Sequence, residues 1–131
     1  MLKNRDVNVS NSDQVEKISD SFKKQFGSGP DIIVRCPGRV NLIGDHTDYN
    51  GGLVLPIALP FETVIAAASS EDAQMKLISE EFGPAHFSLE DNPMGTSGWG
   101  RYIHAMGTLL SQSNPSLLGW NGYICSTIPI L

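Results

Sequence analysis

The sequence predicts a single domain of the α+β class. The chain has 131 residues, of which 40% are hydrophobic and 18% charged, and this is the size and composition of one globular domain. Apolar residues recur at helical spacing in two segments, and runs rich in isoleucine, valine and alanine lie between them. Because these segments do not alternate as regular βαβ units, they favour an α+β fold over a parallel α/β fold.

Two helices are predicted, one near each end of the chain. In residues 12–26 the apolar positions recur every three or four residues, and Gly27 follows as a natural C-terminal stop. The same periodicity predicts an amphipathic helix over residues 99–110.

The remaining segments are predicted to be strands and loops. The expected strands span residues 31–36, 53–58, 62–68, 74–79, 85–89 and 121–128. Residues 38–52 are expected to form a loop with one tight turn, and the Gly-, Pro- and Ser-rich residues 91–98 a second loop. The polar residues 1–10 are expected to be a disordered tail.

Composition excludes several classes of partner. The net charge of −5 leaves no basic stripe to neutralise a nucleic acid backbone. The most apolar run, residues 53–61, is short and interrupted by prolines, so no membrane span is expected, and the first residues lack the apolar core of a signal peptide. Cys36 and Cys125 form no metal-binding pattern and are predicted to be two buried free thiols of a cytoplasmic protein.

Residues 38–52 carry the chemistry of the sequence, since polar side chains crowd there between two apolar runs. They are Arg39, Asn41, Asp45, His46, Asp48 and Asn50, with glycines at 38, 44, 51 and 52. Carboxylates beside an imidazole and an amide suit a ligand with neighbouring hydroxyls, such as a sugar. The fork of donors on an arginine suits a phosphate. The combination indicates phosphoryl transfer to a sugar.

Other interpretations of these residues remain open at this point. Arg39 could form a surface ion pair with a nearby carboxylate. Asp and Asn side chains favour turns because they bond their own backbone, and Asn50-Gly51 is a strong turn signal. A metal site is weakly indicated, because no further ligand set with suitable spacing appears. His86 and His104 lie outside the motif and are interpreted as structural.

The segment 38–52 closely resembles the galactokinase signature of the GHMP small-molecule kinases, and its flanks 34–37 and 54–58 resemble the same family. Weaker similarities follow in Ser79-Glu-Glu-Phe82, in the Trp99-x-x-Tyr102 pair, and in residues 126–130, which resemble the strand before the family's phosphate loop. The resemblance implies the GHMP kinase N-terminal domain, a fold similar to domain 2 of ribosomal protein S5.

The resemblance also implies an activity and site residues. The activity is phosphorylation of galactose by ATP at the anomeric hydroxyl to give galactose 1-phosphate, with Mg²⁺. Arg39 would be catalytic, by stabilising charge on the transferred phosphoryl group. The implied sugar-binding residues are Asp45, His46, Thr47, Asp48, Tyr49 and Asn50, and those near ATP are Ser79, Trp99 and Tyr102. Trp99 and Tyr102 could equally be core aromatics at helical spacing.

Two departures from the family pattern qualify these expectations. Asp45 stands where galactokinases usually have Glu, so its reach toward a sugar hydroxyl is shorter, although galactose remains the first choice. The sequence ends at Leu131, where the family continues into its phosphate loop, catalytic Asp and magnesium ligands. We therefore expect residues 11–131 to be a partial domain that is inactive alone. The alternative is a non-catalytic sugar-sensing module.

Overall fold

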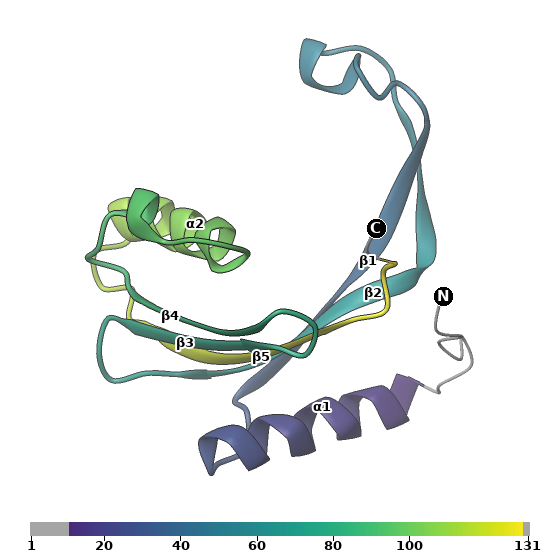
Figure 1. Cartoon of the computed structure of the whole chain (residues 1–131). Coiled ribbons are helices and arrows are strands. Elements are labelled where there is room, and N and C mark those ends of the chain that lie inside the picture. The colour runs from purple at the N-terminus through teal and green to yellow at the C-terminus, as the bar shows by residue number, and fades with distance from the viewer. Residues whose placement is uncertain (1–10, 130–131) are drawn as a thin grey trace.

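A mixed five-stranded sheet with one helix on each face forms the body of the protein (Figure 1). The computed structural model describes residues 11–129, so the predicted tail 1–10 lies outside the described residues. The elements are α1 (Asn11–Phe26), β1 (Ile32–Ile43), β2 (Leu55–Ser69), β3 (Gln74–Ser79), β4 (Gly83–Ser88), α2 (Gly100–Ser113) and β5 (Trp120–Ser126), with short 3-10 helices at Asp48–Asn50 and Pro93–Gly95. The predicted α+β class is confirmed. Within the described residues, no helix is both long and apolar enough to cross a membrane.

The strand order is β1-β2-β5-β3-β4, with β3 and β5 parallel and the other neighbours antiparallel. β1 and β2 are much longer than the others, whereas β5 pairs with β2 only over Thr63–Ser69. Beyond that point the two long strands continue together as a hairpin that projects from the sheet (Figure 1). We call residues 38–60 the hairpin arm. The motif identified in the sequence lies on this arm and not in the body.

Two hydrophobic clusters hold the helices against the sheet. α1 packs Ile18 and Phe22 on Val64 and Ala66 of β2, and Phe22 is 0% exposed. The other cluster consists of Met75, Leu77, Phe87 and Leu89, with Trp99, Ile103, Leu117 and Trp120 against it. The helices lie on opposite faces of the sheet (Figure 1), so each stabilises a different part of it.

The structure corrects two predictions around the motif. β1 continues through Ile43, so the first half of the predicted loop is strand. The two strands predicted around Pro60 are one continuous strand, Leu55–Ser69. Pairing explains both, since Val40 lies opposite Ile57 and extends the ladder. Pro56 and Pro60 are tolerated because β2 has a neighbour on only one side there.

The prediction of two buried thiols is wrong for one of them. Cys36 is exposed, and it lies on β1, which forms the edge of the sheet among the described residues. Cys125 is half-buried and packs against the α1 cluster. Burial, together with the negative charges of Glu80 and Glu62, raises the pKa of Cys125 from 9.0 to about 11.

The two cysteines should therefore differ in reactivity. At pH 8, iodoacetamide should label Cys36 much faster than Cys125, because the attacking species is the thiolate and burial also hinders access. The rise in pKa alone reduces the thiolate fraction of Cys125 roughly a hundredfold. Peptide mass spectrometry measures both rates, and the control is labelling in guanidinium, where the two rates should converge. Equal rates in the folded chain would contradict the packing of Cys125.

Candidate functional site

The hairpin arm positions Arg39 through an irregularity in the pairing of β1 with β2. The register shifts between Pro37 and Arg39 and again between Asn41 and Ile43. An extra residue in one strand bends that strand and redirects the side chains that follow it. Between Pro37 and Arg39 the extra residues are in β2, which runs from Glu62 to Ala58 over the same interval, so the bend is in the strand opposite Arg39. Arg39 pairs with Ala58, and its side chain is exposed.

The base of the arm is fastened to the body. The Arg35 Nε donates to Glu62 Oε2 at 2.9 Å, and this hydrogen bond raises the pKa of Arg35. The backbone N–H of Glu62 donates to the Thr127 hydroxyl at 2.9 Å, and the Thr127 N–H returns a bond to the Glu62 carbonyl. These bonds tie β1, β2 and the segment after β5 together where the arm leaves the sheet.

The tip of the arm, residues 44–52, is a compact turn. The N–H groups of Thr47 and Asp48 donate to the carbonyl of Gly44, and those of Gly51 and Gly52 donate back to Asp48 and Thr47. This last pair is the arrangement that ends many helices, with Gly51 in the left-handed region at φ 72°. Gly44 has φ 99°, and a Cβ there would lie 2.6 Å from the Leu53 carbonyl oxygen.

Four of the predicted sugar-binding side chains also bond within the tip. The Thr47 hydroxyl donates to the Leu53 carbonyl at 3.1 Å, and the Asn50 amide donates to the His46 carbonyl at 2.8 Å. His46 Nδ1 lies 2.8 Å from the Tyr49 hydroxyl, with the rings edge to face. The turn-forming interpretation is therefore correct for Asn50, and the Thr47 side chain, for which it was not considered, also fixes the backbone of the tip.

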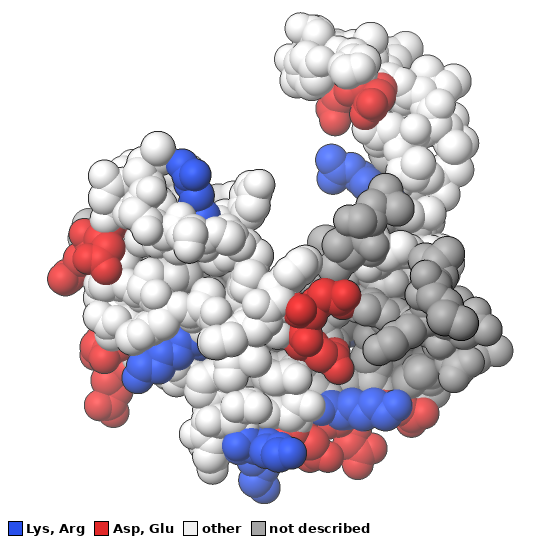
Figure 2. Space-filling view, viewed as in Figure 1, with Lys and Arg blue, Asp and Glu red and all other residues white. Residues whose placement is uncertain are grey.

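Three charged residues of the motif behave differently. Arg39, Asp45 and Asp48 are exposed, and within residues 11–129 none of them forms an ion pair or a side-chain hydrogen bond. The ion-pair interpretation of Arg39 is therefore wrong for the described part of the chain. Figure 2 shows acidic atoms at the tip and basic atoms farther down, both on the side of the arm that faces a hollow between the arm and α2. The only acidic residues of the arm are Asp45 and Asp48, and its only lysine or arginine is Arg39.

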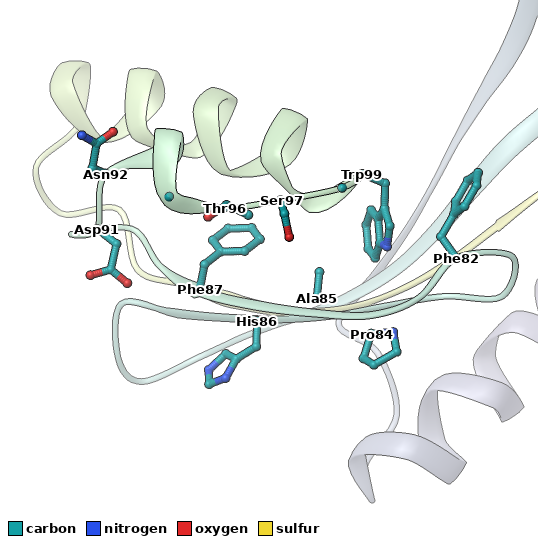
Figure 3. A pocket seen from close by; sticks show the side chains of 12 residues that line it. Phe82, Pro84, Ala85, His86, Phe87, Asp91, Asn92, Thr96, Ser97 and Trp99 are labelled. Atoms are coloured by element: carbon teal, nitrogen blue, oxygen red, sulfur yellow. The ribbon is translucent and has the colours of Figure 1, made fainter.

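A separate pocket of about 660 Å³ lies between β4 and the loop that precedes α2. In Figure 3, Ala85 lies between Phe87 and Trp99, and Ser97 lies above them, whereas His86 points to the opposite face of the sheet. The lining residues are Phe82, Pro84, Ala85, His86, Phe87, Asp91, Asn92, Gly95, Thr96, Ser97, Gly98 and Trp99. An open pocket with aromatic walls and a few polar groups suits a small molecule with a flat apolar part.

Of the three residues predicted to lie near a nucleotide, one lines this pocket and two do not. Trp99 lines the pocket. Ser79 is buried at the β3–β4 turn, where its hydroxyl accepts the N–H groups of Glu81 and Phe82 at 3.3 and 3.2 Å. Tyr102 is 83% exposed and is not among the pocket-lining residues. The roles of Ser79 and Tyr102 stay predictions.

Sequence reasoning missed most of this pocket. Phe82, Phe87 and Thr96 line it from segments that looked like an ordinary hairpin and loop. The available signal was the alternation of apolar residues in 85–89 followed by the glycines of 95–100. That pattern indicates a strand next to a closely packed loop, but it does not show that the two enclose a cavity.

The described residues do not fit a magnesium site. Within residues 11–129, no three His, Cys, Asp or Glu side chains are grouped so that they could hold a metal ion. The metal interpretation of the motif therefore gains no support, and no step through Mg²⁺ is derived for this chain.

The geometry of the tip yields a direct test of Gly44. Gly44→Ala should lower the free energy of local opening at the tip by about 1–3 kcal/mol, because the new Cβ meets the Leu53 carbonyl and the backbone is left-handed. Amide exchange of Thr47, Asp48 and Gly52, measured by NMR, reports this opening. The matched control is Gly29→Ala, where nothing lies within 4 Å. Equal protection in both variants would contradict the tip structure.

Comparison with known proteins shows which families this geometry resembles. Residues 20–69 match the galactokinase galactose-binding signature. The structure of Lactococcus lactis galactokinase complexed with galactose is similar, with 32% identity and a TM-score of 0.74 over 88% of this chain and 31% of that one. Mevalonate kinase from Methanococcus jannaschii, at 22% identity and a TM-score of 0.58 over 76% of this chain and 33% of that one, shares the fold.

The signature covers the base of the arm, Arg39 and the whole tip, which are the features that led to the resemblance. The structural match extends over 88% of this chain, well beyond the signature, and it confirms the expected GHMP kinase fold. This chain spans about a third of the length of the kinases that it matches, and it is similar to the galactokinases in its signature and to the GHMP kinases in its fold.

Proposed function

We propose that this chain forms the sugar-binding part of a galactokinase-type kinase and one wall of its nucleotide site. The reaction is transfer of a phosphoryl group from ATP to the anomeric hydroxyl of galactose. Two observations carry the proposal. Acidic and basic atoms of the arm lie on the side that faces the hollow (Figure 2). The charged residues of the arm, Arg39, Asp45 and Asp48, form no ion pair or side-chain hydrogen bond within residues 11–129. The chain spans 31% of the matched galactokinase, so the other walls of both sites would come from the part that it does not match.

The tip would hold the sugar. Ionised Asp45 and Asp48 accept hydrogen bonds from hydroxyls, and no group within residues 11–129 uses their carboxylate oxygens. Thr47 and Asn50 contribute indirectly, since their bonds to the backbone keep the tip in one conformation before the sugar arrives. The His46–Tyr49 pair presents a fixed polar edge beside the carboxylates.

Arg39 would act on the phosphoryl group. As the anomeric oxygen bonds to the γ-phosphorus, the bond from that phosphorus to the bridging β,γ-oxygen breaks and ADP leaves. The proton of the anomeric hydroxyl would pass to a general base in the part of the kinase that this chain does not match. Negative charge is spread over the phosphoryl oxygens during this step, and a positioned guanidinium stabilises it. The absence of an ion pair within residues 11–129 leaves the charge of Arg39 available for this role.

The pocket beside Trp99 would receive the adenine of ATP. Its aromatic walls match a flat ring, and Asn92, Thr96 and Ser97 offer polar groups at the rim. Its location across the hollow from the arm supports a nucleotide that extends toward Arg39.

Galactose binding is the first test. Galactose should raise the thermal unfolding midpoint of the chain, since a ligand that binds only the folded state stabilises it. Asp45→Asn and Asp48→Asn should each weaken binding by about 10- to 100-fold, the effect of losing a hydrogen bond to a charged group. The matched control is Asp20→Asn, an exposed position on α1. Loss of binding in the control but not in the tip variants would contradict the proposed sugar site.

Transfer itself is tested in a chimera. The matching segment of the Lactococcus lactis galactokinase is replaced by this chain, and turnover of galactose is followed by an ATP-coupled assay. The chimera should be active, and Arg39→Ala should lower kcat by about 10²–10³ with little change in galactose binding. A folded chimera that binds galactose without turnover would instead favour the sugar-sensing alternative.

A further inference from the structure

Helix α2 packs unusually closely on β4, and His104 lies at the centre of the contact. Gly100 and Gly107 are buried on the same face of the helix, and a Cβ at either position would come within 2.8 Å of Ala85 or 2.6 Å of Leu89. His104 lies between these glycines and is 0% exposed. Its ring stacks on Phe87, with the ring centroids 4.3 Å apart and the planes 16° apart.

Packing alone does not explain a histidine at this position. Its Nε2 is buried and has no hydrogen-bond partner within residues 11–129. A buried polar atom without a partner costs stability, whereas a phenylalanine could stack on Phe87 without that cost. The histidine therefore contributes through its other nitrogen, Nδ1, which lies 2.7 Å from the Thr96 hydroxyl oxygen.

Thr96 connects His104 to the pocket. Thr96 and Phe87 both line the pocket, so the two groups that fix the His104 ring are parts of the pocket wall. The backbone bonds of the preceding loop, from Gly95 to Asn92 and from Thr96 to Pro93, are local to it. A contact from Arg101 to Met94 also joins this loop to α2, but it lies at an exposed position.

We infer that His104 is a positioning residue for this pocket. Its bond to Thr96, made rigid by the stack on Phe87, holds the wall formed by residues 96–99 at a fixed distance from β4. His104 does not line the pocket, so it acts on a bound molecule through Thr96 and the adjoining Trp99. The expected effect of His104 on binding rests on the proposed nucleotide site, whereas its expected effect on the wall does not depend on any ligand.

The variants separate the hydrogen bond from the packing. His104→Phe keeps an aromatic ring on Phe87 and removes both nitrogens, whereas His104→Asn keeps a polar group near Nδ1 and loses the stack. Thr96→Val removes the partner hydroxyl with little change in shape. The matched control is Thr108→Val, because the Thr108 hydroxyl donates to the backbone carbonyl of His104 and not to the loop.

The readouts are amide exchange of residues 95–99 without ligand, global stability in urea, and affinity for a non-hydrolysable ATP analogue. In His104→Phe and in Thr96→Val, amide exchange in the wall should be about three- to tenfold faster, which is the effect of one lost hydrogen bond. The variant that combines both substitutions should exchange no faster than either single variant, because both remove the same bond. His104→Phe should be at least as stable as the original chain. His104→Asn should unfold more easily while its wall amides stay protected relative to global unfolding. Thr108→Val should leave wall exchange unchanged.

The inference is overturned if amide exchange of residues 95–99 is unchanged in both His104→Phe and Thr96→Val. It is also overturned if these two variants lose protection there only in proportion to their loss of global stability. Affinity for the ATP analogue should fall by the same factor as the protection of the wall. If the original chain does not bind the analogue, the proposed nucleotide site fails, while the exchange measurement still decides the role of His104.

Discussion

The pairing of β1 with β2 beyond the edge of the sheet is the constraint on which the candidate site depends. A two-stranded ribbon without a core behind it is marginally stable in water. Here the ribbon is held at both ends. Glu62 bonds to both Arg35 and Thr127 where the arm leaves the body, and the hydrogen-bonded turn closes the tip. Between these anchors the arm carries Arg39 and the acidic residues away from the packed core, where charged groups can stay solvated.

The two faces of the sheet carry separate hydrophobic clusters, and each cluster supports a different candidate site. The cluster under α1 fixes the strands from which the arm emerges, and its buried residues take no part in either candidate site. The cluster on the other face holds β4 and α2 together and thereby shapes the pocket. The sheet between them sets the distance from pocket to arm. The positions of both sites are thus consequences of strand pairing and helix packing.

Periodicity and composition were sufficient for the elements whose signals are local. The helix at Asn11–Phe26 and the strand at Gln74–Ser79 lie within a residue of their predicted limits, because an apolar face or a β-rich run defines each one. The strand character of residues 38–43 was not predicted, since Gly38 and the polar residues look like a loop until their pairing with residues 55–58 is known.

The candidate site shows the same limit. A contiguous motif identified the residues of the tip. Their hydrogen bonds separate Thr47 and Asn50, which fix the backbone, and the His46–Tyr49 pair from two carboxylates that have no partner in the described part of the chain. That division depends on the fold of the turn and could not be read from residue types. The contact between His104 and Thr96 could not be predicted from the sequence either, because it depends on how closely α2 approaches β4.

The self-contained turn at the end of the arm has an evolutionary consequence. Its conformation is maintained by bonds among residues 44–53, and none of its side chains belongs to either hydrophobic cluster. If the tip holds the sugar as proposed, replacements at Asp45 or Asp48 alter which hydroxylated molecule is recognised while the domain keeps its folding stability. Ligand preference in such an architecture can drift without the usual conflict between acquiring a new specificity and remaining folded.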